Sequence, residues 1–273
     1  MTKDDATQPP EPAPTSAAQR SRAAEARSLV VEAQVSGLVH LARLTDAEEL
    51  LLGGGLWALS DVDVVTRWAA LSPSRQDAVL VGARRSLLAR DLATVEESMA
   101  GKQSEPLDAD LLVPSAALGL VMAARANATF VGLTGGPETH PIPGPRLYAL
   151  VDDEGLQGLV VEVAAGGEHD YRLASPELAA RRLTAWALRH LQAPKPEDRP
   201  PMLVVELLRH REGETMTMAG ALVTAPRGLL TLATRDFEGA RERTVAVGAE
   251  DVEHALLTLL LEAAVQTGQP ADE

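Results

Sequence analysis

The chain has 273 residues, of which 45% are hydrophobic and only 3% aromatic, and its formal net charge is −14. Its length allows one large domain or two small ones around an aliphatic core. The acidic charge argues against binding to nucleic acid or anionic membranes, and the absence of cysteine excludes disulfides, thiol catalysis and thiolate metal sites. We expect a cytoplasmic protein without a signal peptide or membrane insertion, since no run of about 18 apolar residues occurs.

The N-terminal part of the chain is predicted to hold a loose tail followed by helices. Residues 1–22 are rich in Pro, Ala and acidic side chains and are predicted to be disordered. Residues 23–44 fit either one helix or a strand followed by a helix. Thr45 is predicted to cap the next helix, with Glu48 completing a capping box, and Gly53-Gly54-Gly55 is predicted to end it.

Two further helices are predicted over residues 60–70 and 72–92. The second begins with Ser72 as its cap and Pro73 in its first turn, where the missing amide costs nothing. Residues 94–106 are polar and are predicted to form a loop.

The chain then passes into its second half through a helix, a strand and a loop. Residues 107–126 are predicted to form a helix pair, or one helix entered at Pro114. A strand is predicted at residues 128–133. The segment TGGPETHPIPGP (134–145) is predicted to be a hinge or loop, because so many Gly and Pro residues fit neither a helix nor a central strand.

The second half is predicted to repeat one order of elements twice. Both copies contain Ala-Leu-Val, from Ala149 and from Ala221, and both then turn into Gly-Leu, at Gly155 and at Gly228. In the first copy, the predicted elements are strands 146–151, 156–164 and 169–174 and a helix from Ser175 to Gln192. In the second copy, they are strands 202–210, 215–223, 228–235 and 241–247 and a helix from Ala249 to Val265.

The predicted fold class is α+β, with a helical N-terminal half and a pseudo-two-fold, mainly antiparallel sheet built from two repeats. Each repeat is a β-meander followed by a helix, and the hairpin-short connections argue against a parallel βαβ fold. The expected boundaries are 1–22 for the disordered tail, 23–133 for the mainly helical half, 134–192 for the first unit, 193–200 for a proline-rich linker, 201–266 for the second unit and 267–273 for a second disordered tail.

Short motifs that could carry chemistry are interpreted as structural. Gly53-Gly54-Gly55 and Gly135-Gly136 lack the residues of a Walker loop and the spacing of a dinucleotide fingerprint, so turns or caps are predicted. Glu168-His169-Asp170, with Glu138 and His140 as possible companions, is interpreted as a solvated turn, because neighbours on a strand point to opposite faces.

The remaining titratable residues are scattered, and we expect no site at which several of them converge. Asp61 and Asp63 fit the positive end of a helix dipole. No Gly-x-Ser-x-Gly motif occurs. Surface or helix-end positions are expected for four single histidines, His40, His190, His210 and His254. The sequence therefore assigns no catalytic, cofactor-binding or metal-binding residue, implies no cofactor, and favours a protein that is not an enzyme.

Arginines on the predicted helix 72–92 are candidates for a nucleic-acid surface. Arg84-Arg85 and Arg90 could belong to a recognition helix, and short helices followed by a strand are typical of a winged helix. The acidic net charge argues against this reading. Arg181-Arg182 is interpreted as the solvated face of its helix.

The C-terminal part of the chain resembles the EspG family, the cytosolic chaperones of actinobacterial type VII (ESX) secretion systems. The resemblance is carried by AGALVTAPRGLLTLATRDFEGARERTVAVGAEDVEHALLTLL, in which Ala225-Pro226-Arg227-Gly228 matches the family's turn. ARRSLLARDLA (83–93) is similar to the family's Leu-x-x-Arg-Gly-Leu step, with Asp91 in place of the Gly. The resemblance to the EspG family implies a pseudo-two-fold fold over about residues 25–265. It also implies a helical secreted client, either a PE/PPE-like heterodimer or a WXG-type protein.

Three functions remain open from the sequence. The first is a non-enzymatic chaperone that holds a helical substrate of a type VII secretion system. The second is a winged-helix-like transcriptional regulator with a C-terminal sensing domain, and the third is a hydrolase or transferase with an unrecognised site. The residues of a partner-binding surface and the oligomeric state do not follow from the sequence.

Overall fold

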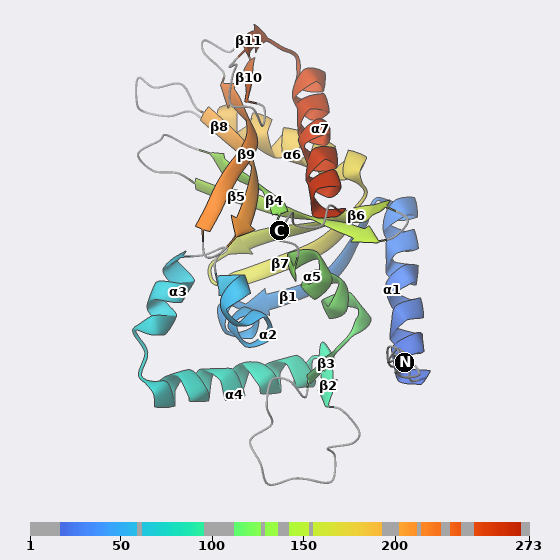
Figure 1. The fold of residues 1–273 in the computed structure, drawn as a ribbon, viewed down its shortest axis with the longest axis vertical. Helices are drawn as coiled ribbons and strands as arrows, with labels where there is room; N and C mark the ends of the chain where they lie inside the picture. Colours follow the sequence, from blue (N-terminus) through green and yellow to red (C-terminus); the bar gives the residue numbers. More distant parts are fainter. Residues whose placement is uncertain are drawn as a thin grey trace, which may run out of the picture.

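The computed structural model describes residues 17–58, 62–95, 112–126, 129–135, 142–152, 155–192, 202–211, 214–224, 230–235 and 243–268. Within these ranges the fold is α+β, with helices packed on both faces of an antiparallel sheet (Figure 1). The helices are α1 (Ala17–Ser36), α2 (Asp46–Ala58), α3 (Val62–Ala69), α4 (Pro73–Ala89), α5 (Ala116–Ala126), α6 (Pro176–Gln192) and α7 (Ala249–Gly268).

The main sheet has nine strands, and every neighbouring pair is antiparallel. Its order is β1-β7-β6-β5-β4-β8-β9-β10-β11, and β2 and β3 form a separate two-stranded sheet. The strands are β1 (Leu38–Thr45), β2 (Ala93–Val95), β3 (Leu112–Pro114), β4 (Thr129–Gly135), β5 (Ile142–Asp152), β6 (Gly155–Ala165), β7 (Glu168–Ala174), β8 (Met202–Arg211), β9 (Glu214–Thr224), β10 (Thr231–Arg235) and β11 (Arg243–Ala246).

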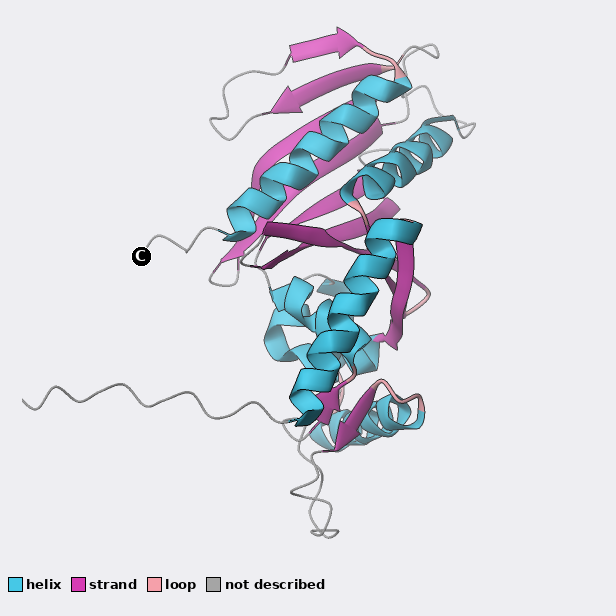
Figure 2. Ribbon diagram, turned by 90° about the vertical axis from the view of Figure 1, so that its right-hand side faces the viewer, coloured by secondary structure: helices cyan, strands magenta, loops and turns pink. Residues whose placement is uncertain are grey.

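The order of the strands places two meanders side by side. From β4 the chain runs outward through β5, β6 and β7, and from β8 it runs outward in the other direction through β9, β10 and β11. The two meanders meet where β4 pairs with β8, in a register that sets Val131 opposite Leu207. Each meander is followed by a helix, α6 or α7, and these two helices contact each other (Figure 2).

Two hydrophobic cores lie on opposite faces of the sheet. One core joins β4–β7 and β9–β10 to α6 and α7, and it includes Leu147, Leu159, Leu183 and Leu256. The other core packs the opposite face of β5–β7, together with β1, against α1, α2, α4 and α5. Strand alternation explains the division, because successive side chains point to opposite faces. The helical first half therefore covers the strands of the second half, and it contributes β1 to the edge of the same sheet.

Several expected elements are confirmed. Helices α3, α4 and α6, strand β4 and the strands of both meanders lie close to their predicted positions. Pro73 occupies the first turn of α4, although the Ser72 side chain makes no capping hydrogen bond there. The β6–β7 turn contains Gly166 and Gly167 with φ of 63° and 83°, as a tight hairpin between twisted strands requires.

The expectation for residues 23–44 is wrong, because this segment forms a helix followed by a strand. The helix α1 already begins at Ala17, so residues 17–22 of the expected disordered tail are helical. Gly37 ends the helix with φ of 81°, and its amide donates to the carbonyl of Ala33 at 2.8 Å. A Cβ at Gly37 would lie 2.9 Å from Leu178 Cδ2, so the position favours glycine twice over.

Two further expectations are wrong because tertiary structure overrides the local propensity of glycine and proline. The helix α2 continues through Gly53-Gly54-Gly55 to Ala58, since glycine weakens a helix by about 1 kcal/mol per residue without ending it. Strand β5 begins at Ile142, inside the segment expected to be a loop. Pro143 lies opposite Thr134 beside a register shift in β4, and proline is tolerated in a sheet at such bulges.

The segment 107–126 also differs in part from its prediction. One helix, α5, begins at Ala116, where the Ser115 hydroxyl accepts a hydrogen bond from the Leu118 amide at 3.2 Å. Residues 112–114 form β3, which pairs with β2, so part of the expected 94–106 loop is strand as well. The 193–200 linker, residues 1–16 of the first predicted tail and residues 269–273 of the second lie outside the described residues. Residues 267 and 268 of the second predicted tail belong to α7, so that expectation is wrong for them.

Candidate functional site

Seven polar side chains from α2, α5 and three neighbouring strands meet beneath the helices of the first half. They form what we call the polar cluster, whose members are Asp46, Glu49, Arg125, Tyr148, Glu162, His169 and Tyr171. All but Asp46 are at most 8% exposed to solvent. Buried charges at this density are rare in proteins and require partners, so the cluster is the first place to look for a function.

The start of α2 places two of the acidic members. Thr45 and Glu48 form the predicted capping box: the Thr45 amide donates to Glu48 Oε2 at 2.8 Å, and the Glu48 amide donates to Thr45 Oγ1 at 3.3 Å. Arg90, at the end of α4, holds the other Glu48 oxygen at 2.5 Å. Because the cap fixes where the first turn begins, Asp46 and Glu49 lie over the end of β7.

Strand alternation and register place the sheet members. His169 and Tyr171 are two residues apart on β7 and therefore point to the same face. Glu162 on β6 lies opposite Tyr171 on one side and opposite Arg146 of β5 on the other. Arg125 reaches the same point from the last turn of α5.

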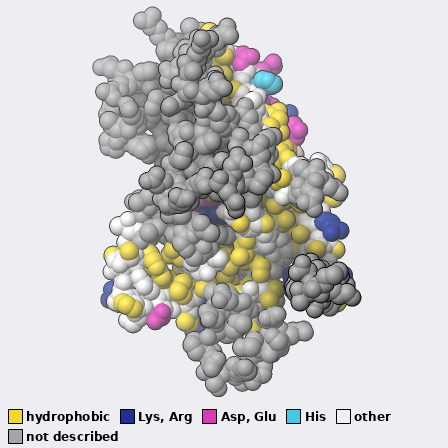
Figure 3. Space-filling view, in the orientation of Figure 1, with side chains coloured by type: hydrophobic (Ala, Val, Ile, Leu, Met, Phe, Trp, Pro, Cys, Tyr) yellow, Lys and Arg dark blue, Asp and Glu magenta, His cyan; other side chains and the backbone are white. Residues whose placement is uncertain are grey.

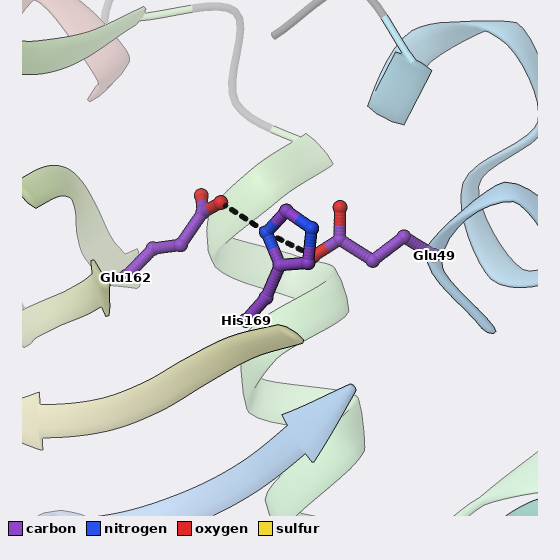
Figure 4. Close-up of side chains that lie close together, drawn as sticks. All are labelled: Glu49, Glu162 and His169. Atoms are coloured by element: carbon purple, nitrogen blue, oxygen red, sulfur yellow. Dashed lines mark hydrogen bonds and ion pairs between the residues drawn. The ribbon is translucent and has the colours of Figure 1, made fainter. Parts of the chain in front are cut away.

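His169 is held by carboxylates at both ring nitrogens. Its Nδ1 lies 2.8 Å from Glu162 Oε1 and 3.3 Å from Glu49 Oε1, and its Nε2 lies 2.9 Å from Asp46 Oδ1. Figure 4 shows the imidazole between the carboxylates of Glu49 and Glu162. An imidazole can donate from both nitrogens only when it is protonated, so the geometry fits a buried imidazolium.

Arg125 supplies the second buried cation. It donates to Glu49 Oε1 at 2.8 Å and to the Tyr171 hydroxyl, which in turn donates to Glu49. Its guanidinium carbon lies 5.5 Å from the centre of the Tyr148 ring and 5.8 Å from that of Tyr171. Aromatic faces and carboxylates together therefore compensate the burial of this charge.

The pKa values follow from burial and these neighbours. Burial alone would raise the pKa of Glu162, but hydrogen bonding to His169 and the charges of Arg125 and Arg146 lower it to about 2. Burial would likewise lower the pKa of His169, but the hydrogen bond to Glu162 and the charges of Glu49 and Glu162 raise it to about 9. Burial raises the pKa of Glu49 against the opposing charge of Arg125.

The two tyrosines are fixed as neutral hydrogen-bonding groups. Burial, followed by the charge of Glu162, raises the pKa of both Tyr148 and Tyr171. Tyr148 donates to Glu162 Oε2 at 2.7 Å. The phenols therefore act as donors to the carboxylates over the ordinary pH range.

The spacing of Glu49, Glu162 and His169 resembles that of a metal site, since one ligand atom from each lies within 4.8 Å of the others. The hydrogen bonding does not fit a metal. A metal needs an unprotonated imidazole nitrogen, whereas both nitrogens of His169 face carboxylates. Arg125 also lies 2.8 Å from Glu49 Oε1, where it would repel a cation. The arrangement is a compensated network of ion pairs that joins α2 and α5 to the sheet.

The structure corrects the interpretation of the Glu168-His169-Asp170 segment. His169 is 2% exposed and lies inside the cluster, so it is not part of a solvated turn, and titratable groups do converge. The alternation argument itself is confirmed, because Glu168 is exposed and Asp170 lies on the other face, where it binds Arg172. The side chains of Glu138 and His140 lie outside the described residues.

The other residues that the sequence singled out lie away from the cluster. His40 and His254 are exposed, as expected, while the side chains of His190 and His210 are outside the described part. Arg181 lies 3.8 Å from Glu253 of α7 and Arg85 is exposed. Gly53-Gly54-Gly55 lies within α2, so the expected cap is wrong there, and Gly135 ends β4.

Of the polar cluster, sequence reasoning singled out only His169 and missed the other six members, Asp46, Glu49, Arg125, Tyr148, Glu162 and Tyr171. A usable signal was present for two of them. Glu162 interrupts the apolar strand sequence LVVEVA, and Arg125 follows the apolar helix sequence ALGLVMAA. A charged residue within a run that is otherwise buried requires a partner of opposite charge, and pairing these two would have located the cluster.

Comparisons with known proteins leave the family open. No family model matches the chain. Over 51 residues, 19% of this chain, the sequence is 41% identical to the human protein "Transmembrane protein 278". The match spans 31% of that protein's length, which is too little of either chain to show a family. In the described part of this chain, every helix is too short or too polar to cross a membrane.

Proposed function

We propose that the chain is a non-enzymatic, EspG-like chaperone that holds a helical substrate of a type VII secretion system in the cytoplasm. The observation that carries this proposal is the order of strands in the sheet, β7-β6-β5-β4 followed by β8-β9-β10-β11. That order runs outward in both directions from one antiparallel pair, as the pseudo-two-fold fold implied by the resemblance would require. The step from fold to function rests on the resemblance, because a fold alone does not specify an activity.

We also propose that the two meanders and their helices are structural repeats. A two-fold axis between β4 and β8 would relate β4–β7 and α6 to β8–β11 and α7, since an antiparallel strand pair has local two-fold symmetry. Superposing the Cα atoms of the two units tests this directly. Units that overlay only strand by strand, with α6 and α7 in unrelated positions, would contradict it.

The state of the polar cluster supports a binding role over a catalytic one. Its carboxylates, imidazole and guanidinium bond one another at 2.8–3.3 Å and are covered by α2 and α5. A catalytic acid or base must reach a substrate proton at hydrogen-bonding distance. Here the pairs would have to separate first, at the cost of exposing or stranding buried charge.

The proposal is tested by complex formation with defined candidates. The full chain is co-expressed with a PE/PPE-like heterodimer and, separately, with a WXG-type protein, and each mixture is analysed by size-exclusion chromatography with light scattering. We expect a stoichiometric complex, and we expect it to be lost when an apolar residue at the client's helical tip is replaced by Asp. If neither class of client forms a complex with the intact chain, the proposal fails.

A winged-helix-like regulator is the second candidate, and one observation favours it. The helix α4 leads into the two-stranded antiparallel sheet of β2 and β3, which is the order of a recognition helix and a wing. Of the expected basic residues, Arg90 is committed to Glu48 and to the carbonyl of Arg43 at 2.7 Å, while Arg85 is exposed. A mobility-shift assay with genomic fragments at moderate salt, repeated with Arg85→Glu, decides this alternative.

A further inference from the structure

A hollow of about 430 Å³ lies between α6 and the outer strands of the sheet, on the face opposite the polar cluster. This volume is near the lower end of the roughly 300–1,000 Å³ range of binding pockets. Its walls combine side chains of β1, β5, β6 and β7 with one side of α6. The lining includes Leu38, Val161, Val163, Leu183, Trp186 and Arg189.

The floor of the hollow is apolar and open to solvent. Val163 of β6 is 44% exposed, and Trp186 of α6 is half-buried beside it. The other face of the same strands is covered by helices of the first half. On the side of the molecule drawn in Figure 3, hydrophobic side chains also reach the surface among the described residues. An enclosed small-molecule site would bury these groups, whereas an open apolar shelf suits side chains presented by a protein surface.

The rim of the hollow carries two exposed arginines, Arg182 and Arg189. Arg182, Trp186 and Arg189 follow one another at four and three residues along α6, so they share one side of the helix. Arg172 at the rim is neutralised by Asp170, with nitrogen–oxygen distances of 2.6 and 2.8 Å. Arg182 and Arg189 are exposed, and neither has an ion-pair partner among the residues that the structure describes. On a chain of net charge −14, this local excess of positive charge selects for a negative partner.

We propose that this hollow binds an acidic amphipathic helix of the client protein. The client's apolar side chains pack on Trp186 and Val163, and carboxylates on either side of that apolar stripe pair with Arg182 and Arg189. This is the helix-in-groove mode, in which residues one turn apart anchor the helix, and Trp and Arg are the residues that contribute most at such interfaces. The inference that the partner is helical rests on the proposed function. The location of the binding surface and the negative charge of the partner are inferred from the geometry of the hollow and its arginines.

A second copy of the chain fits the hollow less well. Two molecules of net charge −14 repel each other at long range. A helix of opposite local charge is drawn to the arginines without that penalty. The solution mass measured by light scattering separates the two occupants, because a dimer that Arg182→Glu/Arg189→Glu dissociates would overturn the proposal.

The surface can be tested without knowing the client. The probe is a fluorescein-labelled peptide of about 18 residues with leucines on one helical face and glutamates beside them, compared with the same peptide carrying lysines in place of the glutamates. Fluorescence anisotropy with the full chain should give at least roughly tenfold tighter binding for the glutamate peptide, weakening as salt is added. Equal binding of both peptides would overturn the proposal.

Charge reversal locates the binding. Arg182→Glu/Arg189→Glu should weaken binding of the glutamate peptide by at least roughly tenfold. The matched control, Arg75→Glu/Arg85→Glu, makes the same charge change at exposed positions of α4 and should leave the affinity within about twofold. A control as damaging as the test pair would mean that net charge alone is measured.

The same variants separate this inference from the proposed function. If the unaltered chain binds the secretion client and Arg182→Glu/Arg189→Glu binds it equally well, the chaperone proposal stands and the hollow is the wrong surface. If the glutamate peptide binds at the hollow but no secretion client forms a complex, the surface stands and the proposed function fails. Val163→Asp, on the exposed floor, gives an independent variant expected to abolish both interactions.

Discussion

Strands β6 and β7 present two faces with opposite properties. On one face, Glu162, His169 and Tyr171 are buried in charge pairs beneath α2 and α5. On the other, Val163 and Arg172 border a hollow that is open to solvent. A single residue step along β6 separates the two environments. Among the described residues, the titratable groups that lie closest together are also paired with one another, so their proximity by itself does not indicate activity.

We expect the polar-cluster face to contribute mainly to stability, and we propose that the other face contributes to recognition. Substitutions in the polar cluster should cost folding free energy, since removing one member leaves its partners buried and unpaired. Substitutions around the hollow should leave stability unchanged and alter only what binds there.

Glu162→Ala should have the largest effect, about 3–5 kcal/mol, because it leaves His169 and Tyr148 without their shared acceptor in the interior. Urea denaturation followed by far-ultraviolet circular dichroism measures the loss. Glu168→Ala is the matched control, because its side chain is 57% exposed and surface changes usually stay within about 0.5 kcal/mol. Similar losses for both variants would mean that the cluster does not hold α2 and α5 to the sheet.

The stability of the chain should fall as the pH rises from about 6.5 to about 9. The folded structure raises the pKa of His169 from 6.5 to about 9, so its contribution is complete below pH 6.5 and disappears as the folded imidazolium loses its proton. The urea midpoint at several pH values measures this. His169→Gln should remove that alkaline slope, and a variant with the original slope would show that another group titrates. The acid side is less diagnostic, because the shifts of Glu49 and Glu162 oppose each other.

Thr45→Ala should destabilise the chain by about 1 kcal/mol, the usual cost of losing a helix cap. The change removes the hydroxyl that accepts from the Glu48 amide, while the Thr45 amide still donates to Glu48. Thr45→Ser keeps the hydroxyl and should retain most of the stability in thermal unfolding. If Ser and Ala behave alike, the capping hydrogen bond is not what positions Asp46 and Glu49.

Arg182→Glu/Arg189→Glu should have the smallest effect on stability, within about 0.5 kcal/mol, because both side chains are exposed and neither has an ion-pair partner among the described residues. Arg189 makes a single exposed hydrogen bond, from its Nε to the carbonyl of Ala185 in its own helix. Its effect on peptide or client binding should nevertheless be large. Differential scanning fluorimetry beside the binding assay compares the two. A large loss of stability would place these arginines with the polar cluster as structural elements and remove the contrast between the faces.

Local signals were sufficient where the physics is local. The capping box at Thr45 and Glu48 and the Pro73 helix start each depend on a few consecutive residues, and both occur in the structure. The prediction of residues 23–44 failed because Gly37 divides them into a helix and a strand, and β1 is stabilised by pairing with β7, which lies more than 120 residues further on. The prediction that Gly53-Gly54-Gly55 ends a helix failed for a related reason, since the continuation of α2 depends on packing that the local sequence does not specify.

The α+β class, the approximate strands of both meanders and the acidic, cysteine-free character follow from the amino-acid sequence, because alternation, turn residues and charge are local properties of the chain. Only the tertiary structure decided that Asp46, Arg125 and His169 share one buried network, and that Arg182 and Arg189 border an open apolar surface. Both depend on which distant segments the sheet brings together. Strand pairing and helix packing set those distances, and a local pattern does not encode them.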